Sequence, residues 1–483
     1  MKTNISRRDF LKSTTLASVG FWVASGLTPK VSASPNERIA LAGFGVGNVG
    51  GASLGEAARF GDVVAVCDVD HPTLNWVGGH VYPKSKSYTD YRRLLDEMDK
   101  SIDAVTVGTA DHMHAPISLM AMRMKKHVFV QKPLARTVYE SRLMGTVAKE
   151  MGVCTQMGNQ GSADDGLRRN AAEIKAGLHG EFKEIHIWLS QTGPRPATIR
   201  TMQAYEEQVR KENPEEAEEL IAEMMKKKEE AFERVDWDLW LGIAPEREFF
   251  PGIYHPSVWR GWWDFGGGTI GDWACHILNG YQKGLDISAP SSIVARTSGH
   301  DFDAFPRSSE VVFEYPDMLQ RRGFKLVWYD GGRHPSREFY EENGLSYPEK
   351  MPEGGEVVIK YDDRRKENVT VPEPRYAPKY PDADGNIADP QDISIRNVYE
   401  WITAIKENNP ELCFSNFTDQ AGPLTEAASL GKVAIWTASK PNEWGEKILW
   451  DSENMTVTNL ADLETPGVAE QVKPVYREGH VLD

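Results

Sequence analysis

The sequence predicts an α/β protein that begins with a doubly wound parallel sheet of the Rossmann type. Three observations indicate this fold: short apolar segments alternate with amphipathic ones, a glycine-rich turn follows the first apolar segment, and an aspartate ends the second. Strands that alternate with helices at this spacing are typical of a parallel sheet covered on both faces. The 483 residues exceed one ordinary hydrophobic core, so we expect a second domain as well.

We place the first domain at residues 34–155. Each expected strand is a short, mainly apolar run, and each expected helix carries its apolar residues at helical spacing. The strands are expected at 38–42, 63–68, 103–108 and 127–130, and the helices at 88–98 and 115–124.

A second α/β domain is expected at 156–450, followed by a C-terminal tail at 451–483. Residues 203–234 are dense in Glu and Lys, which predicts a solvated helical insertion broken near Pro214. The remaining pattern predicts a larger, mostly antiparallel sheet with helices attached to it. Its strands are expected at 184–189, 292–295, 309–315, 324–329 and 357–361, and its helices at 167–176, 397–406 and 423–436.

Residues 1–33 have the pattern of a twin-arginine export signal. Arg7 and Arg8 precede a weakly apolar run, and residues 31–33 offer small side chains to a signal peptidase. The alternative is a membrane anchor, but the run is shorter than the roughly 20 apolar residues that span a bilayer. We therefore expect an exported, periplasmic or otherwise extracytoplasmic protein without stable membrane insertion.

The chain is acidic, with a formal net charge of −16. Cleavage after Ala33 would leave 50 basic and 70 acidic residues. A surface of this charge repels phosphate backbones, so we expect no nucleic-acid partner. The four cysteines are widely scattered and form neither a metal-binding spacing nor a disulfide framework, and we expect no metal.

The glycine-rich turn permits two alignments with a dinucleotide-binding pattern. In one, Gly43 and Gly45 are the first two glycines and Asn48 replaces the third; in the other, Gly45, Gly47 and Gly50 form a complete set. Because the expected strand ends at Gly43, we favour the first alignment, with Gly47 and Asn48 within the turn. Such a turn exposes backbone N–H groups at a helix N-terminus, where a pyrophosphate binds.

The second expected strand ends at Asp68, the distance at which an acidic residue binds the adenosine ribose of a dinucleotide. Asp68, with Asp70 close to it, would repel a 2′-phosphate, so we predict NAD as the cofactor and regard NADP as the weaker candidate. Outside the cytoplasm there is no free pool of nicotinamide nucleotide. The cofactor of an exported protein should therefore be held tightly and regenerated in place.

Three segments, at 109–115, 131–135 and 266–276, resemble the family of glucose–fructose oxidoreductase and inositol dehydrogenase (Gfo/Idh/MocA). The resemblance spans essentially the whole chain after the signal. It implies an N-terminal Rossmann domain and a C-terminal α/β domain whose open sheet often mediates oligomers, so we expect a homo-oligomer.

Residue by residue, the resemblance implies roles for particular side chains. The family's active-site lysine corresponds to Lys132, and its helical aspartate and histidine correspond to Asp272 and His276. Thr109, His114 and Lys132 are expected beside the cofactor. The sequence departs from the family pattern at Gln131, where a glutamate is usual, and at Asn279, where an aspartate is common.

The chemistry of these residues is consistent with oxidation of a sugar alcohol. Such a reaction removes a hydride from carbon and a proton from oxygen, and histidine is the natural proton acceptor near neutral pH. Asp272 and His276 are four residues apart and share one face of a helix, so they can meet a substrate together.

Candidate sugar-binding residues surround this motif. Aromatic and basic side chains cluster just before it, and aromatic faces stack on sugar C–H groups; the alternative is a buried aromatic cluster. Two polar side chains further upstream are candidates for the same cleft. The candidates are Asn159, Arg195, Tyr254, Trp259, Arg260 and Trp263.

Three functions remain open. The first is an exported NAD-dependent oxidoreductase that acts on a sugar or sugar derivative with a tightly bound cofactor. The second is a redox-neutral NAD-dependent glycoside hydrolase or lyase that oxidises, eliminates and then reduces. The third is a non-catalytic sugar-binding protein, which Gln131 supports slightly and the retention of Lys132, Asp272 and His276 opposes.

Overall fold

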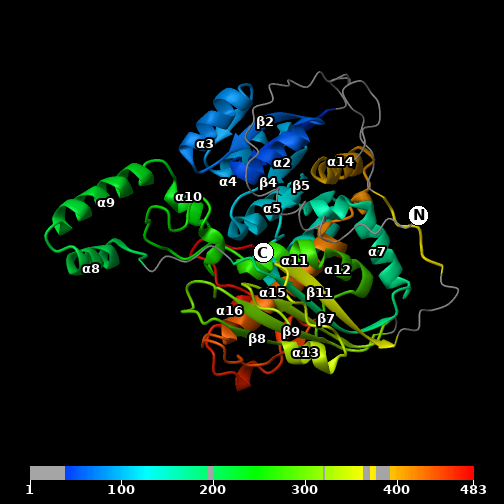
Figure 1. The fold of residues 1–483 in the computed structure, drawn as a ribbon. Helices are drawn as coiled ribbons and strands as arrows, with labels where there is room; N and C mark the ends of the chain where they lie inside the picture. Colours follow the sequence, from blue (N-terminus) through cyan, green and yellow to red (C-terminus); the bar gives the residue numbers. More distant parts are fainter. Residues whose placement is uncertain (1–37, 193–198, 319–320, 363–369, 377–391, 483) are drawn as a thin grey trace.

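The computed structural model describes residues 38–192, 199–318, 321–362, 370–376 and 392–482. The expected export signal at 1–33 and the candidate Arg195 lie outside these residues. The described chain forms two sheets, with the first domain above the second in Figure 1. No helix in these ranges is both long and apolar enough to cross a membrane.

The first domain contains a six-stranded parallel sheet in the order β3-β2-β1-β4-β5-β6. This order reverses between β1 and β4, and ligands of doubly wound sheets bind at the carboxyl ends of the strands near such a point. The strands are β1 (Ile39–Phe44), β2 (Gly61–Cys67), β3 (Lys86–Tyr88), β4 (Ala104–Val107), β5 (His127–Gln131) and β6 (Thr155–Gly158).

Alternating side chains of these strands pack on both faces of the sheet. In β5, Val128 and Val130 face one side and contribute to the largest core cluster, whereas Phe129 faces the other side and packs against Trp401. The intervening helices are α2 (Asn48–Ala58), α3 (His71–Trp76), α4 (Tyr91–Met98), α5 (His114–Arg123) and α6 (Val138–Met151). The predicted Rossmann fold is confirmed.

The second domain contains a seven-stranded sheet in the order β11-β7-β10-β9-β8-β12-β13. Its pairs are antiparallel except for β7 with β10, so the predicted mostly antiparallel sheet is confirmed. The strands are β7 (Glu181–Leu189), β8 (Ser292–Thr297), β9 (Ser309–Tyr315), β10 (Phe324–Tyr329), β11 (Gly354–Asp362), β12 (Ile448–Asp451) and β13 (Thr456–Val457).

The longer helices that follow β6 in the sequence pack in different parts of the molecule. Helix α15 (Gly422–Thr437) contacts both α11 (Gly268–Ile277) and the second sheet, and α7 (Asp165–Lys175) packs on α12 (Asn279–Leu285). Helices α8 (Met202–Glu212) and α9 (Ala217–Phe232) form an arm that projects from the molecule (Figure 1). They correspond to the helical insertion expected at 203–234, and the break between them, at residues 213–216, includes Pro214.

Three segments lie outside their expected domains. Strand β6 extends the first sheet beyond residue 155, because its residues pair with β5. Helix α14 (Ile393–Lys406) returns to the first domain, where the Trp401 indole donates a hydrogen bond to the Cys154 carbonyl at 3.1 Å. The expected tail at 451–483 contributes β13 and α16 (Val468–Val472) to the second domain, because Val457, Val468 and Val472 are buried.

Candidate active site

The glycine turn begins one residue later than expected. Strand β1 continues through Gly43 to Phe44, and the positive φ of +68° that a tight turn requires occurs at Gly45. A Cβ atom on Gly50 would lie 1.9 Å from the Gly45 carbonyl oxygen, so Gly50 permits the close contact between helix and strand. Gly47 is the N-cap of α2 and has no side chain with which to cap it. The complete alignment of Gly45, Gly47 and Gly50 therefore describes the turn, and the favoured alignment was wrong.

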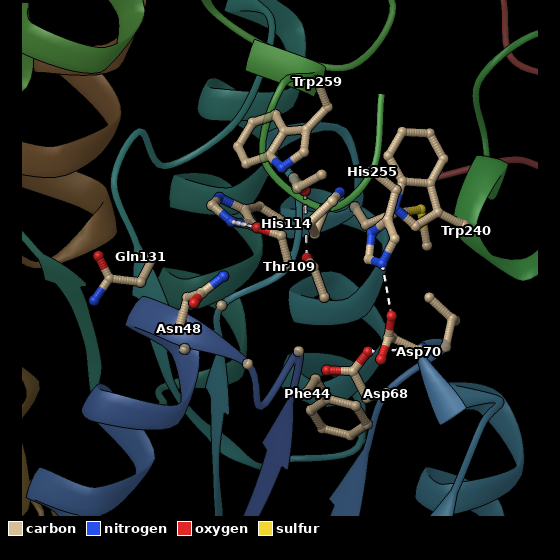
Figure 2. Close-up of a pocket in the computed structure, with 18 of the residues that line it drawn as sticks. Phe44, Asn48, Asp68, Asp70, Thr109, His114, Gln131, Trp240, His255 and Trp259 are labelled. Carbon is tan, nitrogen blue, oxygen red and sulfur yellow. Dashed lines mark hydrogen bonds and ion pairs between the residues drawn. The ribbon is translucent and has the colours of Figure 1, made fainter. Parts of the chain in front are cut away.

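The structure separates the two residues that belong only to the discarded alignment. Gly43 lies within β1 beneath α2, where an added Cβ would meet Leu54 Cδ2 at 2.5 Å. Asn48 is the first residue of α2 and lines a cavity at the carboxyl edge of the sheet (Figure 2). Gly43 therefore permits α2 to pack closely on β1, and Asn48 faces the space that a ligand would occupy.

This cavity has a volume of ≈ 340 Å³ and is bounded by the ends of β1, β2, β4 and β5. Its floor includes the glycine turn, and residues 239–240 and 255–260, which follow the first domain in the sequence, form its opposite wall. In Figure 2, Asn48 and Gln131 lie on one side, and Trp240 and His255 lie on the other. The uncapped N-terminus of α2 directs backbone N–H groups at this space, as a dinucleotide pyrophosphate requires.

The acidic end of β2 fits the adenosine ribose of NAD. Asp68 accepts hydrogen bonds from the backbone N–H of Val46 at 2.8 Å and of Asp70 at 3.0 Å, which fix its carboxylate at the cavity wall. Burial raises the pKa of Asp68 despite these bonds. Asp70 accepts from the His255 imidazole at 2.9 Å and from the backbone N–H of Thr73. Two carboxyl groups here oppose a 2′-phosphate, as expected.

Thr109 and His114 line the same cavity, between the loops that follow β4 and β5. The buried ring of His114 has its Nδ1 at 2.8 Å from the Pro133 carbonyl oxygen and its Nε2 at 3.1 Å from the Thr109 carbonyl oxygen. Burial lowers the pKa of His114. The ring therefore connects the two loops and shapes the cavity floor.

The opposite wall belongs to residues 235–260, which we call the strap; the sequence predicts a role only for Tyr254, Trp259 and Arg260 of this segment. Its first part is fastened to the first domain through the backbone, because the N–H of Asp236 donates to the Val69 carbonyl at 2.9 Å. Further along, His112 Nε2 lies 3.0 Å from the Trp240 carbonyl oxygen, and His255 pairs with Asp70. The strap therefore crosses the carboxyl edge of the sheet and is held at several points.

A chain of alternating charges joins the strap, α11 and the end of β5. The Lys132 ammonium forms an ion pair with Asp272 Oδ1 and donates to the Asp272 carbonyl at 3.3 Å. Arg260 Nε lies 3.5 Å from Asp272 Oδ1, and its Nη1 donates to both carboxylate oxygens of buried Asp111 at 3.1 Å. Burial opposes the ionisation of Asp272, but Arg260 and Lys132 outweigh it and hold its pKa below the ordinary value.

His276 lies one helical turn beyond Asp272 and is half-buried. Its Nδ1 is 3.0 Å from Oδ1 of Asn159, the residue that follows β6. Desolvation of the ring and the positive charge of Lys132 lower the pKa of His276 to about 3. The imidazole is therefore neutral near pH 7, the form that can accept a proton.

The five candidate sugar-binding residues that the structure describes divide into three groups. Trp259 and Arg260 line the cavity. Tyr254 and Trp263 are buried in the core, Tyr254 among the strap's aromatic rings and Trp263 against Phe305, so the alternative of a buried aromatic cluster holds for them. Asn159 is fully buried and contacts His276, which makes it a support of the site.

Gln131, which replaces the family's glutamate, does not pair with Lys132. Its side-chain amide donates to the Ser53 hydroxyl of α2 at 2.6 Å. It thereby fastens α2 to the end of β5 beside the cavity. The described residues include no group of three His, Cys, Asp or Glu side chains that could hold a metal ion.

Comparison with known proteins shows to which family the chain belongs. Residues 38–159 match the NAD-binding Rossmann fold of the Gfo/Idh/MocA oxidoreductase family, and residues 219–341 match the family's C-terminal alpha/beta domain. The chain belongs to the Gfo/Idh/MocA family. Its first domain is therefore an NAD-binding Rossmann domain, as the turn and the acidic end of β2 predict.

Solved structures show the same fold. An inositol dehydrogenase homolog from Azotobacter vinelandii, solved with NAD+, has a TM-score of 0.51 and 16% identity, over 85% of this chain and 97% of that chain. GenD2 from gentamicin A biosynthesis, solved with NAD, has a TM-score of 0.50 and 16% identity, over 88% and 100% of the two chains. At these identities the likeness concerns the fold alone.

Two curated relatives are closer in sequence over a shorter region. A glycosyl hydrolase family 109 protein of Shewanella baltica and an alpha-N-acetylgalactosaminidase of Shewanella oneidensis are each 30% identical over 216 residues. These alignments cover 38% of this chain and 46% of each relative. The chain thus spans less than half the length of the relatives that it matches.

Proposed function

We propose that this protein is an NAD-dependent enzyme that oxidises a hydroxyl group of a sugar or sugar derivative by hydride transfer. The observation that carries the proposal is the ion pair of Lys132 with Asp272 beside the cavity, with neutral His276 one turn further along the same helix. The Rossmann domain of the same cavity supports NAD as the hydride acceptor.

The chemistry follows from the charges of these side chains. When bound beside the glycine turn and Asp68, NAD would supply the acceptor for the hydride of the carbon that carries the hydroxyl group. His276 accepts the hydroxyl proton, because its surroundings keep the ring neutral. The Lys132 ammonium, oriented by Asp272, donates a hydrogen bond to the same oxygen and stabilises the negative charge that develops there. Trp259 offers an aromatic face to the sugar.

A second candidate function is redox-neutral cleavage of a glycoside. Oxidation of a ring hydroxyl to a ketone acidifies the neighbouring C–H, the aglycone is then eliminated, water adds, and return of the hydride restores the hydroxyl. The names of the two Shewanella relatives favour this candidate.

The experiment is to mix the purified protein, with its bound dinucleotide, with free sugars, inositols and N-acetylgalactosaminides. Reduction of the bound NAD with formation of a keto sugar supports net oxidation. Release of the aglycone without net change in NAD supports the glycosidase. Sugar binding without either reaction rejects both and leaves a non-catalytic sugar-binding protein.

We propose further that residues 1–33 direct export by the twin-arginine route and that the protein is a homo-oligomer. The paired Arg7 and Arg8 support export, and the family's use of its second-domain sheet in oligomers supports assembly. Replacement of both arginines by lysine should keep the precursor in the cytoplasm, as fractionation and immunoblotting would show. Unchanged export of that variant, or a monomeric mass by light scattering, would reject the respective proposal.

A further inference from the structure

The contact between Asn159 and His276 determines which nitrogen of the histidine carries the proton. The Asn159 amide nitrogen is 2.5 Å from the Cys275 carbonyl oxygen, which can only accept a hydrogen bond. The NH2 group of Asn159 must therefore face Cys275. Its carbonyl oxygen Oδ1 then faces His276 Nδ1 at 3.0 Å, and because Oδ1 can only accept, Nδ1 must carry the hydrogen.

Asn159 is held firmly enough to impose this arrangement. Its side chain is completely buried. Its backbone N–H donates to the Met157 carbonyl at 2.7 Å, and its carbonyl accepts from the Ser162 N–H at 2.8 Å. The residue follows β6 directly, so the rigid parallel sheet positions the amide that contacts α11.

We propose that Asn159 is a positioning residue that holds His276 as the Nδ1–H tautomer and so leaves Nε2 as the atom that exchanges protons with the substrate. This proposal extends the proposed function and rests on it, because it takes His276 as the residue that accepts the substrate proton. A neutral imidazole donates through one nitrogen and accepts through the other, so fixing one tautomer decides which atom can act as the base. The tautomer itself is a property of the protein without substrate.

The most direct test is nitrogen-15 NMR of the full chain with labelled histidine, in which the His276→Gln variant identifies the His276 resonances. We expect a protonated Nδ1 and an unprotonated Nε2 at neutral pH in the wild type. The opposite tautomer would overturn the proposal. Because no substrate is used, this result does not depend on whether the proposed function is correct.

Kinetics of two Asn159 variants give a second test. Asn159→Leu removes the acceptor that orients the His276 ring. Loss of a residue that orients a functional histidine lowers activity by about 10- to 100-fold, so we expect kcat to fall by this factor. KM and the amount of bound NAD should be unchanged. Asn159→Asp keeps a hydrogen-bond acceptor and places a negative charge beside the His276 ring. In the wild type, the charged groups that act on this ring are Lys132, Arg260 and Asp272. The added negative charge favours the imidazolium, so the acid limb of the pH–rate profile should move to higher pH.

A matched control separates positioning from packing. Gln156 is an equally buried amide on β6, but it donates to Glu400 on α14 and does not contact His276. Gln156→Leu should leave the pH–rate profile in place. The proposal fails if Asn159→Asp shows no shift while His276→Gln is inactive, or if Gln156→Leu reproduces the effect of Asn159→Leu. In the first case the proposed function survives without the positioning role.

Discussion

Individual charges set the chemistry of the site. Lys132 and Arg260 approach the same carboxylate oxygen of Asp272, so that carboxylate stays ionised although it is partly buried. The same two cations disfavour a positive charge on His276. A single buried charge would be costly, but charges that are paired in this way can be retained. The arrangement keeps an ammonium and a neutral imidazole close together at one pH.

Lys132→Met tests the role of the ammonium. The variant keeps the length of the side chain and removes the hydrogen-bond donor, so kcat should fall by about 10²- to 10⁴-fold. Bound NAD, measured by mass spectrometry of the native protein, should remain, because the glycine turn and Asp68 are unchanged. Lys283→Met, at a half-buried lysine of α12, is the control and should retain activity. Wild-type turnover by Lys132→Met would remove the lysine from the mechanism.

The sequence predicts some of these residue contacts and not others. Asp272 and His276 share a helix, so their spacing alone predicts a common face. The glycine alignment was wrong because the pattern does not show whether β1 stops at Gly43 or continues to Phe44. Asn159 and His276 are 117 positions apart, and only the three-dimensional fold reveals that they are hydrogen-bonded.

Among the elements, the strap has the clearest functional consequence. It lies across the carboxyl edge of the first sheet and carries Trp240, His255 and Trp259 to the cavity (Figure 2). A dinucleotide bound in this cavity would lie between the strap and the glycine turn. Exchange of the cofactor would then require the strap's contacts to open, which agrees with the expected tight binding.

His255→Ala should therefore speed the release of NAD. The variant removes a hydrogen bond to a carboxylate, which contributes about 1.5–3 kcal/mol, so release should accelerate about tenfold or more. The measurement is loss of bound NAD during exchange against labelled NAD. His179→Ala is the matched control, because His179 pairs with Glu173 at 3.2 Å outside the cavity. Equal release rates for the wild type and both variants would show that the strap does not retain the cofactor.

The aromatic composition of the strap predicts only part of its position. Trp259 and Tyr254 are five residues apart, yet one lines the cavity and the other packs against Trp262 and Phe265. Tryptophan and tyrosine serve equally well in cores and in sugar sites, so composition does not separate the two uses. The contacts of the strap with Val69 and Asp70 are long-range pairs that local patterns do not contain.

At the scale of the whole molecule, the two domains are interleaved in sequence. Helix α14 returns from the second half of the chain to cover the first sheet, and β13 and α16 complete the second domain. The sequence predicts both sheets because short apolar runs and alternating apolar and polar residues are both local signals. It predicts the domain borders less well. The helical pattern of a segment such as 393–406 does not show on which domain that helix packs.

This interleaving brings the proposed catalytic groups together. Lys132 comes from the end of β5 and Asp272 from α11, and their ion pair forms where the two parts of the chain meet. Substrate oxidation at this junction requires hydride transfer from the sugar to the bound NAD.

The most direct measurement is a single turnover of the NAD-bound protein with a sugar that carries deuterium on the carbon to be oxidised. We expect deuterium to appear in the bound dinucleotide of the wild type, and to appear about 10²- to 10⁴-fold more slowly in Lys132→Met. This holds for a net oxidation and for the first step of a closed glycosidase cycle alike. If the sugar is converted and no deuterium enters the dinucleotide at any time, hydride transfer to NAD is ruled out.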